Sequence, residues 1–292
     1  MATAFLGPRG TFSEEAALQY IERSGDGDSE MIAFSSFPAL TSAVETGLAR
    51  DAILPIENSI EGAVGGTLDL LIHETPLRIA GELALPVRHF LITAPGIELA
   101  EVTEVASHPQ ALGQCRRFLE RCLPKAAQVA ALSTAAAVEE TVASGDRHRA
   151  AIGTARAASL YGGAILAHDI QDVRANLTRF VALAREDHAP TGDDKTSLGF
   201  TFKTNVPGIL HRILGAFAEA KLQLTKIESR PAKGWLGEYV FLVDLEGHRL
   251  DPAVASAIER IRDDCERFLI FGSYPRFPLE TLQHLRDGPN GT

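Results

Sequence analysis

The sequence predicts a two-lobed α/β protein that is followed by a smaller α+β domain. Short apolar runs of β type alternate with helix-like segments up to Ala184, which is typical of α/β layers. The polar stretch from Glu186 to Lys195 then interrupts this rhythm, as linkers do. Beyond it the order of elements changes. A chain of 292 residues also exceeds what one hydrophobic core usually organises.

The first lobe is predicted from three successive pairs of a strand and a helix. Each apolar run of four or five residues precedes a segment with helical spacing of its apolar positions. In order these are Thr3 to Leu6 and Ser13 to Arg23, Met31 to Phe34 and Phe37 to Gly47, and Asp51 to Pro55 and Thr67 to His73.

A second lobe is predicted from the next series. We expect strands at Leu83 to Thr93, Val102 to Ser107, Gln128 to Leu132 and Ala150 to Gly153, and helices at Ala111 to Leu123 and Ala135 to Ser144. The strand Thr178 to Ala184 comes too late to start another unit, so we expect it to return to the first lobe. A ligand would lie in the cleft between the lobes.

The C-terminal segment is predicted to follow the order βαββαβ, which is that of the ferredoxin-like fold. The elements are Thr196 to Lys203, Gly208 to Ala220, Leu222 to Ser229, Glu238 to Leu245, Pro252 to Asp264 and Arg267 to Gly272. We therefore expect lobe 1 at about 1–78 and 168–187, lobe 2 at about 79–167, a linker at 188–195, a C-terminal domain at 196–275 and a tail at 276–292.

Composition excludes several classes of function. A net charge of −10 without a long Lys/Arg cluster argues against binding of nucleic acid or acidic membranes. No apolar run approaches the roughly 20 residues that a membrane-spanning helix needs, and the N-terminus lacks a basic signal-peptide start, so we expect a cytoplasmic protein. Cys115, Cys122 and Cys265 are predicted to be buried thiols, and the histidines show no metal-ligand spacing.

Four polar clusters stand where predicted strands give way to helices. Free backbone N–H groups at helix starts bind anions, and the carboxyl ends of strands gather at one edge of an open sheet. Together the clusters suggest a carboxylate site, although each cluster alone is better explained as a helix N-cap. They are Gly7 to Ser13 with Thr11, Glu57-Asn58-Ser59, Ser107-His108-Pro109-Gln110, and Ser133-Thr134.

The segment Asn176 to Phe180 (NLTRF) is the most suggestive single stretch. Strand alternation places Asn176 and Thr178 on one face and Arg179 on the other. Taken alone, Thr178 is also an ordinary β-branched strand residue, and Arg179 is also an ordinary partner for a surface ion pair.

In order, these segments resemble the prephenate dehydratase family over nearly the whole chain. The matching motifs are GPRGTFS (Gly7 to Ser13), PIENSIEG (Pro55 to Gly62), TLDLL (Thr67 to Leu71), SHPQAL (Ser107 to Leu112) and NLTRF. The part after the linker resembles an ACT domain, with NVPGIL from Asn205 to Leu210 and ESRP from Glu228 to Pro231. The resemblance implies a two-lobed fold similar to periplasmic binding proteins, no metal or organic cofactor, and a homodimer or homotetramer.

The resemblance also implies roles for individual residues. The essential hydroxyl of the family falls on Thr178, which would assist the departing ring hydroxyl of prephenate. Asn58, Ser59, Ser107 and Thr134 are candidate neighbours that stabilise the developing charge. Glu57 either transfers protons or orients donors. Further expected substrate contacts are Thr11, His108, Ser133, Asn176, Arg179 and Phe180, with His108 either a general acid or a helix cap, and Arg179 either a carboxylate ligand or an ion-pair partner.

For regulation, the resemblance implies that L-phenylalanine binds between the ACT domains of two subunits. The expected effector residues are Asn205, Pro207, Gly208, Ile209 and Leu210 from one segment and Glu228, Ser229 and Arg230 from the other. Two departures from the family pattern are Tyr161-Gly162-Gly163, where a leucine is usual in third place, and Ile209, where alanine is usual. The second could alter the affinity for the effector or the choice of effector.

The sequence leaves three other functions open. An arogenate dehydratase performs the same elimination on the amino-acid analogue of prephenate, and no residue separates the two. A non-catalytic sensor with a ligand cleft and an ACT domain is the alternative from another class, and Thr178 argues against it. The related prephenate decarboxylases lack the threonine and typically the ACT domain, whereas both are expected here.

Overall fold

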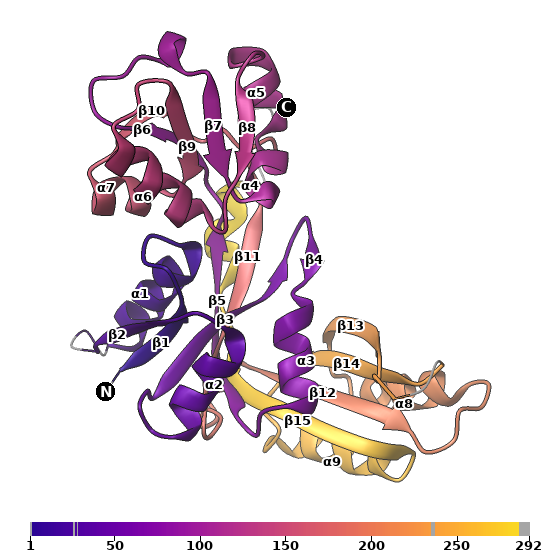
Figure 1. Cartoon of the computed structure of the whole chain (residues 1–292). Coiled ribbons are helices and arrows are strands. Elements are labelled where there is room, and N and C mark those ends of the chain that lie inside the picture. Colours follow the sequence, from indigo (N-terminus) through magenta and orange to yellow (C-terminus); the bar gives the residue numbers. More distant parts are fainter. Residues whose placement is uncertain (1, 26, 28, 235–236, 286–292) are drawn as a thin grey trace.

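The computed structural model describes residues 2–25, 27, 29–234 and 237–285, and within them the strands form three sheets (Figure 1). Two of the sheets belong to the lobes, and the third belongs to the C-terminal domain. Of the predicted tail, residues 286–292 lie outside the described residues. The part that is described continues into a 3-10 helix, η2 (Leu279–Leu285).

The first lobe is built on a sheet with the strand order β2-β1-β3-β11-β5, to which β4 adds at β3. β1, β2 and β3 are parallel, and β11 runs antiparallel to both of its neighbours. Strand β11 therefore lies where the sequence argument placed the returning strand. The elements are β1 (Thr3–Leu6), α1 (Phe12–Ser24), β2 (Met31–Phe34), α2 (Phe37–Glu45), β3 (Asp51–Asn58), β4 (Gly62–Ala63), α3 (Gly65–His73), β5 (Arg78–Pro86) and β11 (Leu177–Ala184).

The second lobe contains a five-stranded sheet in the order β10-β6-β9-β7-β8. The predicted single helix from Ala111 to Leu123 is divided in two at Cys115, whose φ of −113° and ψ of 16° leave the helical region. The elements are β6 (Phe90–Thr93), η1 (Leu99–Glu101), β7 (Glu104–Ser107), α4 (Pro109–Gln114), α5 (Arg116–Cys122), β8 (Ala127–Ala130), α6 (Thr134–Ser144), β9 (Arg149–Gly153), α7 (Ala155–Tyr161) and β10 (Ala164–Ala167).

The boundary between the lobes differs from the predicted one. The expected strand from Leu83 to Thr93 is two strands, and β5 belongs to the sheet of the first lobe while β6 belongs to that of the second. A boundary at residue 78 therefore falls at the start of β5. The chain leaves the first lobe after Pro86, where the backbone N–H of Val87 donates to the carbonyl of Asn176 at 2.8 Å. Because the apolar run is unbroken, hydrophobic periodicity alone does not show where the chain passes from one lobe to the other.

Polar contacts join the two lobes on the side of α1 and α7. The carboxylate of Glu14 accepts hydrogen bonds from Arg156 at 2.7 and 2.9 Å, and Thr154 Oγ1 donates to the carbonyl of Gly10 at 2.8 Å. Gly10 has a φ of +85°, and a Cβ at this position would lie 3.1 Å from the Cβ of Ala157. A larger residue would therefore be strained and would press the lobes apart.

The C-terminal domain has the predicted βαββαβ order, which confirms the α+β ferredoxin-like part of the fold. Its sheet order is β13-β14-β12-β15, and its own core includes Phe200, Phe217 and Ile258. The elements are β12 (Asp194–Phe202), α8 (Ile209–Glu219), β13 (Leu224–Pro231), β14 (Tyr239–Glu246), α9 (Pro252–Arg262) and β15 (Cys265–Pro275).

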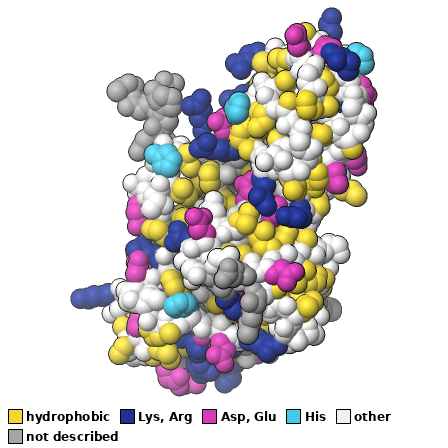
Figure 2. Space-filling model, turned by 90° about the vertical axis from the view of Figure 1, so that its left-hand side faces the viewer, with side chains coloured by type: hydrophobic (Ala, Val, Ile, Leu, Met, Phe, Trp, Pro, Cys, Tyr) yellow, Lys and Arg dark blue, Asp and Glu magenta, His cyan; other side chains and the backbone are white. Residues whose placement is uncertain are grey.

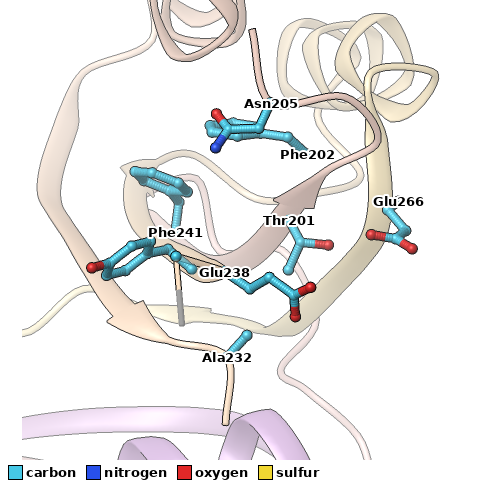
Figure 3. A pocket seen from close by; sticks show the side chains of 9 residues that line it. Thr201, Phe202, Asn205, Ala232, Glu238, Phe241 and Glu266 are labelled. Atoms are coloured by element: carbon cyan, nitrogen blue, oxygen red, sulfur yellow. The ribbon is translucent and has the colours of Figure 1, made fainter. Parts of the chain in front are cut away.

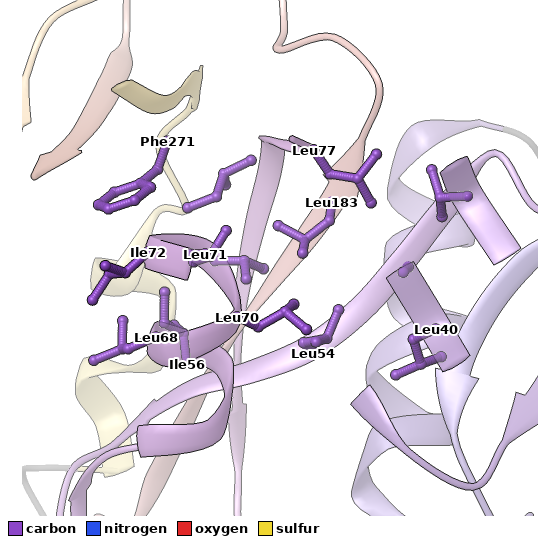
Figure 4. Close-up of a cluster of buried hydrophobic side chains, with 14 of the residues drawn as sticks. Leu40, Leu54, Ile56, Leu68, Leu70, Leu71, Ile72, Leu77, Leu183 and Phe271 are labelled. Carbon is purple, nitrogen blue, oxygen red and sulfur yellow. The ribbon is translucent and has the colours of Figure 1, made fainter. Parts of the chain in front are cut away.

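The C-terminal domain packs directly on the first lobe, and buried side chains of both form one cluster. Figure 4 shows Phe271 of β15 beside Ile72 of α3, and both belong to one buried cluster. The backbones approach closely at Gly272, where a Cβ would lie 2.2 Å from the carbonyl oxygen of Ile79. Only glycine fits there, so the two domains share a tightly fitted boundary.

The surface agrees with a moderately acidic globular protein. On the face shown in Figure 2, basic and acidic side chains are interspersed rather than segregated. None of the helices in the described ranges is long and apolar enough to cross a bilayer. All three cysteines are free thiols; Cys115 is buried, whereas Cys122 and Cys265 are only partly so, contrary to the prediction for those two.

Candidate active site

A cleft of about 330 Å³ lies between the lobes and is lined by residues of both. Neither Lys, Arg, Asp nor Glu occurs among the described residues that line it. The lining consists of apolar, hydroxyl, amide and imidazole side chains: Thr11, Phe12, Ser13, Pro55, Asn58, Val64, Val87, His89, His108, Gln110, Ala111, Gln114, Leu132, Ser133, Thr134, Thr178 and Phe180.

Three helices begin at this cleft, each with a capping side chain. Thr11 accepts a hydrogen bond from the N–H of Glu14 at 3.4 Å, His108 Nδ1 from the N–H of Gln110 at 3.3 Å, and Ser133 from the N–H of Ala136 at 3.0 Å. The N-cap interpretation of these residues is thus correct, and the same residues also line the cleft. The N-terminal ends of α1 and α6 give the cleft a positive potential that suits carboxylates without a cationic side chain.

At the floor of the cleft, Asn58 at the end of β3 holds the hydroxyl of Thr178 at the start of β11. Asn58 Nδ2 donates to Thr178 Oγ1 at 2.9 Å and to Asn176 Oδ1 at 2.8 Å. The two residues meet because Thr178 pairs with Asn58 in the register of β11 against β3. The predicted members Asn58, Asn176 and Thr178 are therefore brought together.

The orientation of the Asn58 amide decides which side chain is the donor in its hydrogen bond with Thr178. Asn58 Oδ1 accepts hydrogen bonds from the N–H groups of Ile60 at 3.0 Å and Glu61 at 2.9 Å, so the NH₂ group must face Thr178. The Thr178 oxygen then acts as an acceptor toward Asn58, and its own proton is free to be donated into the cleft. Phe180, which is 2% exposed, lines the same floor.

Two residues of the cleft, His89 and Gln114, were missed in the sequence analysis. Gln114 Oε1 lies 3.0 Å from His89 Nε2 and accepts a hydrogen bond from Asn176 Nδ2 at 3.3 Å. These contacts make Nε2 the protonated nitrogen of the imidazole. Burial lowers the pKa of His89, so the ring is neutral at physiological pH. Only Gln114, two residues beyond the SHPQAL motif, carried a sequence signal that could have revealed it.

Four expected site residues point elsewhere. Ser107 Oγ is fully buried and donates to the carbonyl of Ile152 at 2.7 Å, which joins β7 to β9. Ser59 Oγ accepts from the N–H of Leu177 at 2.9 Å and so secures the start of β11. Glu57 and Arg179 lie on the opposite strand face from Asn58 and Thr178, because alternate residues of a strand face opposite ways. Arg179 is therefore the ion-pair partner that was its alternative interpretation.

The expected effector residues are divided between two places. Arg230 pairs with Asp69 of α3 at 3.3 Å and lies 3.5 Å from Glu228, so both side chains face the first lobe, whereas Ser229 faces the other side of β13. Gly208, with a φ of +88°, precedes α8, and Ile209 is buried at its start. The segment from Pro207 to Leu210 thus forms a helix start.

A separate pocket of about 270 Å³ lies within the C-terminal domain (Figure 3). Figure 3 shows the rings of Phe202 and Phe241 on one side and the carboxylates of Glu238 and Glu266 on the other. Asn205 is the one expected effector residue among its described lining residues. The pocket is open, with aromatic and acidic walls.

The fold and the cleft define a two-lobed domain for a small anionic ligand, joined to a ferredoxin-like domain. Residues 3–188 match the prephenate dehydratase family, and residues 197–263 match the ACT domain. A prephenate dehydratase of Mycobacterium sp. (strain JLS) is 41% identical over 281 residues, which cover 93% of this chain and 88% of the relative. Arogenate dehydratase 1 of Petunia hybrida is 37% identical over 94% of this chain and 67% of the relative.

Solved structures are similar to this chain over nearly its whole length. Prephenate dehydratase of Arthrobacter aurescens in complex with L-Phe superposes with a TM-score of 0.86 at 35% identity, covering 94% of this chain and 90% of that one. A protein described as a novel type of quorum quenching acylase gives 0.84 at 33% identity, covering 96% and 100%. The chain belongs to the prephenate dehydratase family, and its C-terminal domain is an ACT domain.

Proposed function

We propose that the chain converts prephenate to phenylpyruvate, carbon dioxide and water, and that the Thr178 hydroxyl assists the departing oxygen. The observation that carries this proposal is the Asn58–Thr178 hydrogen bond, which leaves the threonine proton free to be donated into the cleft. Names of relatives at about 41% identity support the reaction.

The reaction requires little more than this directed hydroxyl and correct positioning. The bond to the ring carboxylate breaks, its electron pair enters the ring, and the carbon–oxygen bond to the ring hydroxyl breaks as the ring becomes aromatic. The leaving hydroxide takes up a proton from the solvent and becomes water. A threonine hydroxyl is a weak acid, so its contribution is a hydrogen bond that strengthens as negative charge develops on the leaving oxygen.

We propose prephenate rather than arogenate as the preferred substrate. The side chain of prephenate ends in a 2-oxo carboxylate, whereas that of arogenate carries an ammonium group. An ammonium group in a cleft of low polarity requires a carboxylate partner, and the described lining contains none. The hydroxyl groups and helix N-termini of the cleft suit the carboxylates instead.

Regulation and assembly complete the proposal. We propose that L-phenylalanine is the effector, that it binds between the ACT domains of two subunits of a homodimer or homotetramer, and that the enzyme works in the cytoplasm. The complex of the Arthrobacter aurescens relative with L-Phe supports the effector. In the described ranges, no group of three or more His, Cys, Asp or Glu residues could hold a metal ion.

The test compares both substrates with the purified full-length chain. Product formation is followed by phenylpyruvate absorbance with prephenate and by phenylalanine formation with arogenate, with and without L-phenylalanine. A kcat/KM for prephenate at least tenfold above that for arogenate is expected. A preference for arogenate would reassign the substrate, and an absence of turnover with both would overturn the proposed function.

A further inference from the structure

A buried network of charged side chains lies directly behind the proposed active site. At its centre is Arg179, next in sequence to Thr178 but on the opposite face of β11. Its guanidinium donates to Glu82 Oε2 at 2.7 Å, to Asp244 Oδ2 at 2.7 Å and to the Tyr274 hydroxyl at 2.8 Å. One side chain of the catalytic domain thus bonds to β5 of its own sheet and to β14 and β15 of the ACT domain.

The other members complete the network on the side of the ACT domain. Lys195 of β12 donates to both oxygens of Glu82, at 2.8 and 3.0 Å. Ser197 Oγ lies 2.5 Å from both Asp244 Oδ1 and the Tyr274 hydroxyl. In the buried part of the network two cations, Arg179 and Lys195, pair with two carboxylates, Glu82 and Asp244, and each of these carboxylates is bonded from both domains. Arg179 also lies 3.6 Å from the more exposed carboxylate of Glu57.

The network is largely shielded from water. The side chains of Glu82 and Lys195 are 2% and 9% exposed, and Tyr274 is fully buried. Burial disfavours ionisation of Asp244, but Arg179, Ser197 and Lys195 together more than offset this and hold the pKa of Asp244 below its ordinary value. Burial also raises the pKa of Tyr274, so its hydroxyl stays neutral. Charges that are fully paired in such surroundings cannot change partners without a large penalty.

The boundary around the network is equally tight. Tyr274 and Phe271 of the ACT domain belong to the same buried cluster as Val181 and Leu183 of β11. At Gly272 the backbone of β15 approaches that of β5 so closely that no side chain fits. A shift of the ACT sheet against the first lobe would therefore be transmitted to β11 and would not be absorbed by loose packing.

Because Arg179 is next to Thr178 in β11, a shift of the ACT sheet would also act on the position of the Thr178 hydroxyl. A register shift separates Arg179, opposite Glu57, from Phe180, opposite Pro55. The strand is therefore irregular at the residue after Arg179. Thr178, one peptide away, must keep its hydroxyl 2.9 Å from Asn58 Nδ2. A displacement of about 1 Å of a reacting group can reduce a rate about a hundredfold.

We propose that Arg179 is a positioning residue through which the ACT domain sets the location of the Thr178 hydroxyl, so that the Glu82–Arg179–Asp244–Tyr274 network couples the ACT domain to catalysis. The inference rests on the proposed function. Arg179 does not touch the substrate; it fixes β11 from behind. A movement of the ACT sheet on effector binding would act on the reaction along this route.

The main test uses Tyr274→Phe, which removes one hydroxyl and keeps the ring in the core. Arg179 Nη2 then loses its contact with Tyr274, while Ser197 still bonds Asp244. We expect kcat for prephenate to fall by about three- to tenfold with KM within about twofold, because positioning and not binding is impaired. The concentration of L-phenylalanine that gives half of its effect on activity should shift at least threefold, whereas its binding, measured by calorimetry, should change less.

A stronger variant and a matched control complete the design. Arg179→Gln with Asp244→Asn removes one charge of each sign and should lower kcat by about ten- to a hundredfold, with loss of the response to L-phenylalanine. The control is Arg249→Gln, which breaks another ion pair between the ACT domain and the preceding segment, Arg249 with Asp187 at 2.7 Å. This pair does not contact β11, and the control should retain wild-type kcat and effector response.

The possible outcomes separate this inference from the proposed function. Absence of prephenate turnover by the wild-type chain would refute the function. Wild-type turnover together with a folded Tyr274→Phe variant of unchanged kcat and effector response would refute the coupling and leave the function standing. Equal losses in Arg249→Gln would also refute the coupling, because they would reduce it to a general effect of domain stability.

Discussion

Replacement of Thr178 by valine tests the directed hydroxyl most sharply, because valine has the same shape and lacks only the oxygen. The change removes the acceptor of one hydrogen bond from Asn58 Nδ2. That nitrogen keeps Asn176 Oδ1 at 2.8 Å and the carbonyl of Leu177 at 3.2 Å, so it is not left without a partner. The free energy of unfolding should therefore change by no more than about 1 kcal/mol.

The effect of the same substitution on activity should be far larger. A positioned hydrogen-bond donor to developing negative charge contributes about 10²- to 10³-fold to a rate, so we expect kcat to fall by at least about a hundredfold. This range corresponds to about 3–4 kcal/mol of activation free energy. The loss should appear in kcat with little change in KM, because the departing oxygen gains charge only in the transition state.

The assay follows phenylpyruvate absorbance for the wild type, Thr178→Val and Thr178→Ser. Serine keeps the hydroxyl and should retain activity within about tenfold of the wild type, since it loses only the methyl group that fixes the rotamer. Urea unfolding of each variant measures stability independently. A valine variant that is folded and has a kcat within threefold of the serine variant would refute the role of the hydroxyl.

Two further predictions concern the cleft and the contact between the lobes. Asn58→Asp should lower kcat by about a hundredfold or more while the fold is retained, because the carboxylate would accept the Thr178 proton that now points into the cleft; an unchanged kcat with native circular dichroism would contradict this. Burial opposes the ionisation of Glu14, but the hydrogen bonds from Arg156, Gly10 and Arg9 prevail and lower its pKa to about 2. Since this pKa lies below the ordinary glutamate value of 4.5, the stabilisation is complete above about pH 4.5 and is lost as the pH falls through about 2. Urea unfolding should show Glu14→Gln less stable than wild type by on the order of 2 kcal/mol at pH 7. This difference should shrink below pH 4.5, and a difference that is independent of pH would exclude the Glu14 carboxylate as its source.

Much of the secondary structure follows from local sequence, because its signals act over a few residues. The N-caps Thr11 and Ser133 mark helix starts, and the βαββαβ order after the linker is found as predicted. Exceptions arise where tertiary packing overrides the pattern. The apolar run from Leu83 to Thr93 passes from one lobe to the other, and the helix after Pro109 divides at buried Cys115.

The same division applies to the candidate site. The sequence by itself identified the residues of the Asn58 and Thr178 segments, and strand alternation alone placed Thr178 and Arg179 on opposite faces. What each face meets was decided only by the tertiary structure, since Asn58 contacts residues about 120 positions away and Asp244 lies 65 positions from Arg179. Contacts between residues so far apart in the sequence cannot be predicted from the spacing of residues along the chain. They arise when sheets pack, and this is why His89 joined the cleft while Arg179 became the link to the ACT domain.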